Sequence, residues 1–307
     1  MIDKLRKQIN EYFVGKEDVV ENVLICLLAG GHVLIEDVPG VGKTTLARVL
    51  AGSMDMSFGR IQFTPDTLPG DVTGLSVYNM KTGEFEYREG AIMHHMILAD
   101  EINRTSPKTQ AALLEAMAEG SVTVDGNRYD LPDPFMVMAT QNPTEFIGTY
   151  PLPEASVDRF MMRLSIGYPD KAEELRLARN HIEGKTVDEV KPICTSDDVK
   201  AMKSKVCEVT IADNCLTYAR EIVDLTRTEP RFVLGASPRA FLSLIGASRA
   251  RAFMSGRDFV KPDDIKAVAV NVLSHRLVLT PESRIAGEKK ESIIKTLILK
   301  VKIPSKE

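Results

Sequence analysis

Gly31-His32-Val33-Leu34-Ile35-Glu36-Asp37-Val38-Pro39-Gly40-Val41-Gly42-Lys43-Thr44-Thr45-Leu46-Ala47 is the stretch that decides the fold. Residues 33–35 predict a short buried strand, residues 39–42 a tight loop, and the apolar spacing after Lys43 a helix. Strand, glycine loop and helix in this order are the setting in which a P-loop works. Glycines leave the backbone N–H groups accessible and allow positive φ, and the helix N-terminus adds partial positive charge where phosphates bind.

This loop has the chemistry to bind a nucleoside triphosphate. Lys43 offers a full charge to the β- and γ-phosphates, and Thr44 offers a hydroxyl to Mg²⁺. The residues predicted to bind ATP here are Pro39, Gly40, Val41, Gly42, Lys43, Thr44 and Thr45. The match to G-x-x-x-x-G-K-[ST] is imperfect, because the first glycine of that pattern falls on Asp37. The alternative is a chance Gly-Val-Gly-Lys-Thr string in a strand–helix turn.

Composition limits the class of protein. A length of 307 residues favours about two domains, with 44% hydrophobic and 27% charged residues. The net charge of −4 argues against a broad surface for nucleic acid. The four cysteines show no C-x-x-C pair and are predicted to be buried thiols of a reducing compartment. The polar N-terminus is no signal peptide and the longest apolar run, residues 23–31, is too short for a bilayer, so we expect a cytoplasmic protein.

Strands alternate with helices up to about residue 168, which predicts a parallel sheet. The expected strands are residues 33–35, 60–64, 96–101 and 135–140. Beyond residue 170 the sequence predicts almost only helices, over 171–183, 196–209, 213–226, 238–254, 261–275 and 288–299. We therefore expect an α/β nucleotide-binding domain over residues 1–168 and an all-helical lid over residues 169–307.

Two hairpins are expected within the first domain. Residues 75–78 and 85–87 flank a turn at residues 81–83, inside an irregular insert over 65–91 that is either functional or a plain surface excursion. A second hairpin pairs residues 121–124 with 127–129 around Asp125-Gly126, a pair typical of a type I′ turn.

Two carboxylates end a buried strand at Asp100 and Glu101. A strand end points to the mouth of an open α/β sheet, where ligands bind. Asp100 would hold Mg²⁺ and its waters, and Glu101 would polarise the attacking water. Asn142 follows the next strand and can hydrogen-bond both that water and the γ-phosphate, or else it is a turn amide before Pro143.

Six motifs together resemble the MoxR family of AAA+ ATPases, in the same order and over about residues 13–279. They are Asp-Val-Pro-Gly-Val-Gly-Lys-Thr (37–44), Asp-Glu-Ile-Asn-Arg (100–104), Ala-Thr-Gln-Asn-Pro (139–143), Leu-Pro-Glu-Ala (152–155), Asp-Arg-Phe (158–160) and Gly-Ala-Ser-Pro-Arg-Ala (235–240). Asp37 is usual in that family, so its departure from the general P-loop pattern becomes support. Ser156-Val157 is less typical but leaves the Asp-Arg-Phe triplet intact.

The resemblance implies roles for further residues. Asn142 is similar to sensor 1, Arg159 looks like the arginine finger that reaches the γ-phosphate of a neighbouring subunit, and Arg239 looks like sensor 2 of the helical lid. Val14 and Gly15 match the segment that packs near adenine. The 65–91 insert resembles the insertion in helix 2 of this clade, thought to face substrate in the ring, and the second hairpin resembles the insert before sensor 1.

Other assignments stay open at this stage. Arg159 could instead form a surface salt bridge with Asp158 or Glu154, and Arg104 is a rival arginine for action in trans. Arg239 could be a helix-start arginine on a solvated face.

The resemblance also implies a function. The family is associated with ATP-driven, chaperone-like remodelling in a homo-oligomeric, hexameric ring, often with a partner that carries a von Willebrand factor A domain. The expected cofactors are ATP and Mg²⁺, and the sequence leaves the client open. One alternative is a DNA-acting motor or clamp, which the acidic net charge disfavours. Another is a scaffold that binds ATP without turnover, which the presence of Glu101 disfavours.

Overall fold

The computed structural model describes residues 1–142 and 148–303. The chain folds as two compact units, and it passes between them several times. Unit 1 consists of Met1–Glu21, His32–Arg159 and Leu164–Lys200, and unit 2 of Asn22–Gly31, Phe160–Arg163 and Ala201–Glu307.

A five-stranded sheet with the order β2-β5-β8-β1-β9 forms the centre of unit 1. Its strands are β1 (Val33–Glu36), β2 (Phe58–Gln62), β5 (Met96–Asp100), β8 (Met136–Gln141) and β9 (Met162–Leu164). The first four pair in parallel, with Glu36 opposite Gln141 and Gln62 opposite Asp100. The carboxyl ends of these strands therefore share one edge, and the predicted parallel α/β sheet is confirmed. Strand β2 begins and ends two residues earlier than the sequence predicts.

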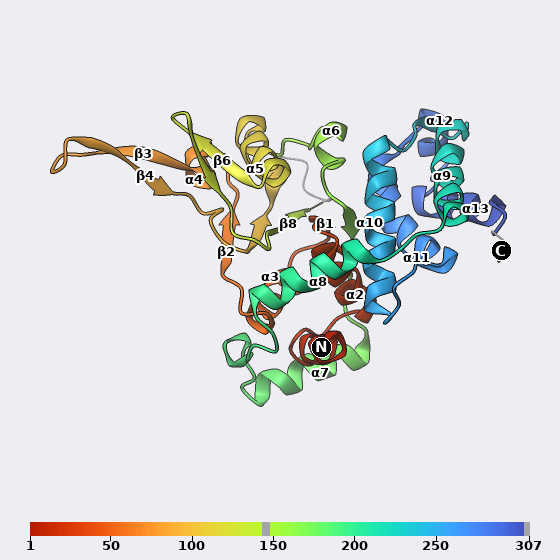
Figure 1. Ribbon diagram of the computed structural model, residues 1–307, viewed down its shortest axis with the longest axis horizontal. Coiled ribbons are helices and arrows are strands. Elements are labelled where there is room, and N and C mark those ends of the chain that lie inside the picture. Colours follow the sequence, from red (N-terminus) through yellow and green to blue (C-terminus); the bar gives the residue numbers. More distant parts are fainter. Residues whose placement is uncertain (143–147, 304–307) are drawn as a thin grey trace. The chain divides into compact units, whose positions relative to one another are not determined.

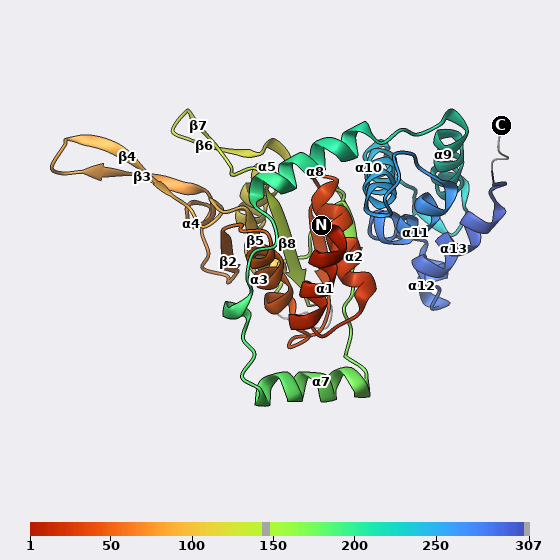
Figure 2. The same cartoon turned by 60° about the horizontal axis from the view of Figure 1, so that its bottom comes forward.

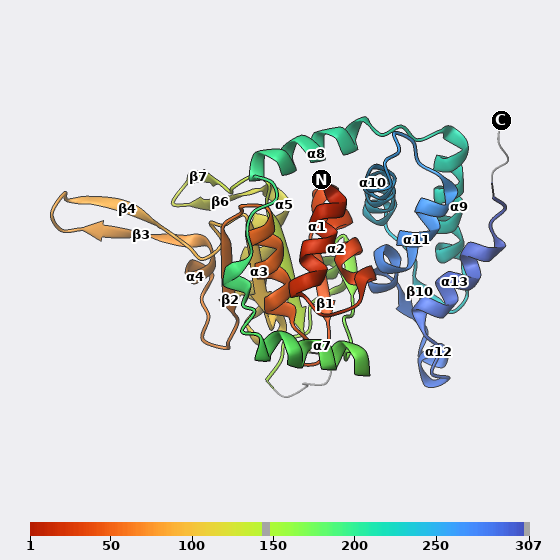
Figure 3. The same cartoon turned by 90° about the horizontal axis from the view of Figure 1, so that it is seen from below.

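Helices flank this sheet. They are α1 (Ile2–Tyr12), α3 (Lys43–Ser53), α4 (Pro69–Thr73), α5 (Pro107–Glu119), α6 (Glu154–Val157) and α7 (Lys171–Ile182), with 3₁₀ turns η1 (Ile102–Arg104) and η2 (Val187–Glu189). Two further helices, α2 (Glu17–Leu28) and α8 (Ser196–Glu208), begin in unit 1 and end in unit 2. Figure 3 shows α1 beside α3, which buries Leu46 and Leu50 completely. The Ser106 hydroxyl caps α5 by accepting from the Thr109 N–H, and Pro107 takes the first helical position.

Both predicted hairpins are confirmed. The first pairs β3 (Gly74–Asn79) with β4 (Glu84–Glu89), and Figure 1 shows it as a long ribbon that leaves the body of unit 1. The second pairs β6 (Ser121–Val124) with β7 (Asn127–Asp130), with φ of 49° and 80° at the two turn residues. The rings of Tyr87 and Tyr129 stack with centroids 3.8 Å apart and so tie the two hairpins together.

Unit 2 is a helical bundle with one short ladder. Its complete helices are α9 (Asp213–Thr228), α10 (Pro238–Met254), α11 (Pro262–Leu273), α12 (Pro281–Ile285) and α13 (Lys290–Lys300), with the turn η3 (Ser274–Arg276). Figure 2 shows α9, α10, α11 and α13 gathered around a common core. That core buries Ile222, Leu244 and Val268 completely. The ladder joins β10 (Phe232–Leu234) to β11 (Val278–Leu279), which the sequence reading had not predicted.

Residues 171–200 belong to the compact unit that holds the sheet. The Ile193 N–H donates to the Ser53 carbonyl at 2.8 Å, and the Gln8 side-chain amide donates to the Lys191 carbonyl at 2.8 Å. These contacts tether the segment to α1 and α3. The two compact units each consist of several chain segments, whereas the prediction divides the chain at a single point, between residues 168 and 169. That boundary therefore stays a prediction.

Three cysteines are buried as predicted, but Cys207 is exposed and corrects that prediction. Helix α8 buries Val199, Met202 and Val206 on one face, and Cys207 lies one residue beyond that face. Among the described residues, no helix is long and apolar enough to cross a membrane.

His275 is a buried imidazole in unit 2. Its Nε2 lies 3.0 Å from the Phe160 carbonyl oxygen, to which it donates, and its Nδ1 has no hydrogen-bond partner among the described residues. Burial, assisted by the charge of Arg276, lowers the pKa of His275 well below its ordinary value of 6.5, and the bond to Phe160 only partly opposes this. His275 is therefore neutral in the folded protein near pH 6.

Acid should destabilise the protein partly through this histidine. Below pH 6.5 an unfolded chain protonates His275 while the folded chain does not, so stability falls as pH decreases, by up to about 1.4 kcal/mol per pH unit until the lowered native pKa is reached. We expect His275→Gln to remove this part of the slope in the free energy of unfolding, measured by urea denaturation between pH 7.5 and 5. The matched control His181→Gln, at an exposed histidine of α7, should keep the wild-type slope. Equal slopes in wild type and His275→Gln would contradict the prediction.

Candidate active site

The glycine loop after β1 adopts the conformation that its glycines allow. Gly40 and Gly42 have φ of 86° and 88°, where other residues are strained. Gly42 is the N-cap of α3, so the first N–H groups of that helix point toward the loop. A Cβ atom at Gly42 would lie 3.3 Å from the Phe13 ring, and one at Gly15 only 2.5 Å from it. Phe13 thus packs closely against both glycines.

Lys43 begins α3 and points into the loop. Its Nζ donates to the Asp37 carbonyl oxygen at 2.8 Å. Partial burial lowers the pKa of Lys43 from its ordinary value, and the charges of Asp37, Asp100 and Glu101 oppose that change. The ammonium group is thus partly desolvated, which favours an anion beside it.

Asp37 has a structural role that explains why no glycine is needed there. The carboxylate is buried, and its Oδ2 accepts the N–H groups of Ile166 and Gly167, each at 2.6 Å, and the Ser165 hydroxyl at 3.2 Å. Its Oδ1 accepts the Val38 N–H at 2.9 Å. Asp37 therefore fastens the start of the loop to the segment that follows β9.

Two cavities of unit 1 meet at the glycine loop. The polar cavity measures about 430 Å³ and is lined by Pro39, Gly40, Gly42, Lys43, Thr44, Thr45, Arg60, Gln62, Asp100, Glu101 and Asn142. The apolar cavity measures about 200 Å³ and is lined by Tyr12 to Lys16, Gly40 to Gly42, Thr45, Ile166 to Pro169, Glu173 and Leu177. Gly40 and Gly42 of the loop and Thr45 in the first turn of α3 line both. A charged, polar cavity next to an apolar one suits a ligand with phosphates at one end and a flat ring at the other.

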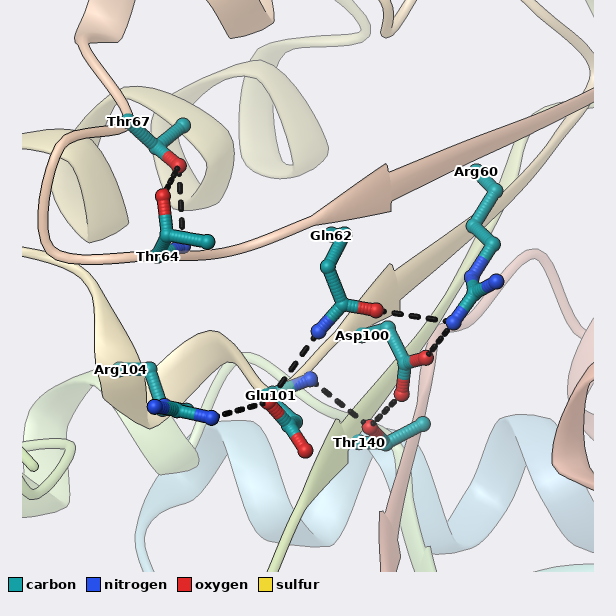
Figure 4. A network of polar contacts seen from close by, with 8 residues as sticks. All are labelled: Arg60, Gln62, Thr64, Thr67, Asp100, Glu101, Arg104 and Thr140. Atoms are coloured by element: carbon teal, nitrogen blue, oxygen red, sulfur yellow. Dashed lines mark hydrogen bonds and ion pairs between the residues drawn. The ribbon is translucent and has the colours of Figure 1, made fainter. Parts of the chain in front are cut away.

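A network of polar contacts fixes the two carboxylates, as Figure 4 shows. The Thr140 hydroxyl donates to Asp100 Oδ1 at 2.6 Å and accepts the Glu101 N–H at 2.9 Å. Asp100 Oδ2 lies 2.7 Å from Arg60 Nη2. Glu101 Oε2 accepts from the Gln62 amide and from Arg104 Nη1, each at 3.1 Å. Each carboxylate is therefore oriented by at least two groups.

Glu101 has an unusual backbone. Its φ of 58° and ψ of 49° lie in the left-handed region, which residues with a Cβ rarely adopt. The turn directs the Glu101 side chain away from the line of β5, and the bond from its N–H to Thr140 holds the conformation. Such local strain often accompanies a functional side chain.

The structure gathers most of the predicted site residues in these two cavities. Val14, Gly15 and Val41 line the apolar cavity, and buried Asn142 lines the polar one. Arg159 instead donates from Nη1 to the Leu114 carbonyl at 2.6 Å. Arg239 is the second residue of α10 in unit 2, and its assignment as sensor 2 stays a prediction. Pro143, the last residue of that motif, lies outside the described residues.

Sequence reasoning assigned no role to three residues of this network. Arg60 and Gln62 lie on β2, and Thr140 lies in the middle of the site on β8. Thr140 belongs to the Ala-Thr-Gln-Asn-Pro motif (139–143). Its place two residues before Asn142 is the sequence signal that could have indicated a role in the site. Nothing in the local pattern around Arg60 and Gln62 points to Asp100, because their contact depends on the pairing of β2 with β5.

Comparisons with known proteins agree with this geometry. Residues 32–162 match the family model "ATPase family associated with various cellular activities (AAA)", and residues 224–297 match an AAA lid domain. The chain is 39% identical to the Mycobacterium tuberculosis protein named Chaperone MoxR1, over 97% of this chain and 81% of that one. The chain belongs to the MoxR family of AAA+ ATPases.

Two further proteins resemble this MoxR-family ATPase along nearly its whole length. The Bacillus subtilis protein YeaC is 50% identical, over 99% of this chain and 95% of that one. A crystal structure described as a putative ATPase from Cytophaga hutchinsonii is 40% identical, with a TM-score of 0.92, and the match covers 99% of this chain and 95% of that one. The MoxR-family chain is thus an ATPase with an AAA sheet domain and an AAA lid, and the expected fold class and family are confirmed.

We expect Asp37→Asn to destabilise the MoxR-family fold. In either orientation the new amide NH₂ faces an N–H group, so at least one backbone donor that is buried or partly buried loses its partner. The free energy of unfolding should fall by about 2–4 kcal/mol, as measured by urea denaturation. The control Asp66→Asn, at an exposed aspartate, should leave it unchanged. A loss for Asp37→Asn no larger than that of the control would contradict the role given to this carboxylate.

We expect Thr140→Val to lower ATPase activity while Thr140→Ser preserves it. Valine keeps the shape but removes the hydroxyl that donates to the Asp100 carboxylate and accepts the Glu101 N–H, whereas serine retains it. Loss of a group that hydrogen-bonds and orients the residues of a site typically lowers activity about 10–100-fold. The measurement is kcat of the two variants, with melting temperatures as a check on folding. If Thr140→Val kept near-wild-type kcat, the hydroxyl would not be needed to align the carboxylates.

Proposed function

We propose that this ATPase hydrolyses Mg²⁺-bound ATP in the polar cavity, as a subunit of a homo-oligomeric ring that remodels a protein complex. One observation carries the proposal: residues 39–40 and 42–45, both carboxylates of residues 100–101 and Asn142 converge on a single polar cavity that adjoins an apolar one. This arrangement supports phosphates on one side of the glycine loop and adenine on the other. Phe13, Val14 and Leu177 supply the apolar walls for the base.

The donor atoms at the strand ends fit Mg²⁺. The Thr44 hydroxyl and the Asp100 carboxylate offer hard oxygen atoms, which this cation prefers. When bound, Mg²⁺ neutralises phosphate charge and aligns the phosphates. In our proposal Lys43 binds the β- and γ-phosphates, Glu101 orients the attacking water, and the Asn142 amide holds that water and the γ-phosphate.

We assign the arginine that completes the site in trans to Arg159. Arg104 already pairs with Glu101 of its own chain at 3.1 Å, which favours a role within its own subunit. The side chain of Arg159 is anchored on the backbone of α5 through Leu114. An arginine supplied by a neighbouring subunit accelerates phosphoryl transfer by about 10³–10⁵-fold, which is the physical reason for a ring. We take six subunits from the family resemblance.

The work done by hydrolysis is proposed from family membership. One relative bears the name of a chaperone, which supports remodelling or maturation of a client complex in the cytoplasm. We base the expected partner with a von Willebrand factor A domain on the family resemblance alone. No nucleic acid is proposed as a ligand, in keeping with the net charge of −4.

Mixing two inactive variants tests the trans arginine. Arg159→Ala keeps an intact pocket but lacks the finger, whereas Glu101→Gln keeps the finger but cannot activate water. We expect each to be nearly inactive alone. An equal mixture that exchanges subunits at random should recover about a quarter of wild-type ATPase activity. At about that fraction of interfaces, an intact pocket from Arg159→Ala faces a finger from Glu101→Gln.

The same mixture with Arg104→Ala in place of Arg159→Ala serves as the comparison. Recovery with Arg104→Ala but not with Arg159→Ala would move the finger to Arg104. No recovery in either mixture, with specific activity independent of protein concentration across the range where oligomers form, would contradict catalysis by a ring.

A further inference from the structure

Arg60 is a cation of the polar cavity to which nothing above gives a function. It lies on β2, the edge strand of the sheet, opposite Leu98 of β5. Its Nη2 lies 2.7 Å from Asp100 Oδ2 and 2.8 Å from the Gln62 side-chain oxygen. Figure 4 shows the guanidinium directed toward the carboxylate that ends β5.

The fold does not need this ion pair. The Arg60 side chain is 48% exposed, and exposed ion pairs contribute at most about 1 kcal/mol to stability. Asp100 is already oriented by the Thr140 hydroxyl on its other oxygen, at 2.6 Å. Arg60 is therefore able to exchange Asp100 for another acceptor at little cost in stability.

A cation held by Asp100 would compete with Arg60 for this carboxylate. Oδ1 accepts the Thr140 hydroxyl and Oδ2 faces the guanidinium, so a cation bound at Oδ2 would weaken the pair with Arg60. An arginine displaced from Oδ2 keeps one acceptor there, the Gln62 amide oxygen. Guanidinium binds phosphate oxygens well, because its planar fork can donate two hydrogen bonds at once.

Arg60 lies near Glu101, because both contact the Gln62 side chain. Gln62, which accepts from Arg60, also donates to Glu101 Oε2 at 3.1 Å. Arg60 thus lies in one hydrogen-bonded group with the residue proposed to activate water, which acts at the terminal phosphate. Lys43 and Thr44 line the cavity from the side of the glycine loop. Arg60 reaches the cavity from the sheet edge instead.

We propose that Arg60 binds the γ-phosphate of ATP within its own subunit, and that Mg²⁺ releases it for this contact by taking over Asp100. This inference rests on the proposed function, because it requires Mg²⁺ and ATP in the polar cavity. The charged side chains that line this cavity are Lys43, Arg60, Asp100 and Glu101, whose charges cancel. Once released, the guanidinium pairs with the γ-phosphate, which ADP lacks, so removal of Arg60 penalises ATP more than ADP.

The test measures nucleotide binding without turnover. Affinities of the full-length wild type and Arg60→Ala for AMP-PNP, a nonhydrolysable ATP analogue, and for ADP are measured by calorimetry, once with Mg²⁺ and once with EDTA. With Mg²⁺ we expect Arg60→Ala to lower the ratio of AMP-PNP to ADP affinity on the order of tenfold, as for loss of one charge-assisted hydrogen bond. With EDTA the ratio should change clearly less, since Asp100 then retains the guanidinium.

Two further variants sharpen the test. Arg60→Lys keeps the charge but loses the fork, so its ratio should lie between those of wild type and Arg60→Ala. Arg128→Ala removes an exposed arginine, paired with Asp130 in the second hairpin, and should leave the ratio at the wild-type value. Because Arg60 is half exposed on an edge strand, Arg60→Ala should fold, and its melting temperature checks this.

The outcomes separate this inference from the function on which it rests. If the ratio of AMP-PNP to ADP affinity of Arg60→Ala, measured with Mg²⁺, lies within about twofold of the wild-type ratio, the inference is overturned. A change of that size is smaller than one hydrogen bond contributes. An equal fall with Mg²⁺ and with EDTA overturns the release from Asp100. If the wild type binds neither nucleotide in Mg²⁺, the proposed function itself fails.

Discussion

The parallel pairing of β1, β8, β5 and β2 is the constraint on which the site depends. Parallel strands end at the same edge, so the residues that follow them meet although they lie far apart in sequence. The glycine loop follows β1, Asp100 and Glu101 end β5, and Asn142 follows β8. The register also sets Gln62 opposite Asp100. A slip of one residue in any ladder would turn these side chains to the other face of the sheet.

This meeting of strand ends concentrates charge, and the network around it keeps the charges apart. Two carboxylates follow each other directly, so each needs its own partners. Thr140 serves both by donating to Asp100 and accepting from the Glu101 N–H, while the left-handed turn at Glu101 separates the two side chains. Preorganised groups of this kind do not have to rearrange when charge develops on a substrate, which is the main source of catalysis in phosphoryl transfer.

Much of this could be predicted from the sequence because the signals are local. The glycine loop and the hairpin turn at Asp125-Gly126 each depend on residues within a few positions, and the structure confirms them. The function of Asp37 could not be derived this way, because its donors lie about 130 positions later, after β9. The contact of Arg60 with Asp100 could not be predicted for the same reason. Asp100 is 40 positions away in sequence, and only the pairing of β2 with β5 brings the two residues together.

Directly after Arg159 the chain passes from unit 1 to unit 2. Arg159 is the last residue of a unit 1 segment, and the next residue, Phe160, belongs to unit 2. There the Phe160 carbonyl accepts hydrogen bonds from both His275 and Arg276, and Arg276 also donates to Ser243, one turn beyond Arg239 on α10. The Arg159 side chain is thus bonded to Leu114 in unit 1. The carbonyl of the next residue, Phe160, is bonded to His275 and Arg276 in unit 2. A rearrangement of α10 that displaced Arg276 would therefore change the support of the peptide that follows Arg159.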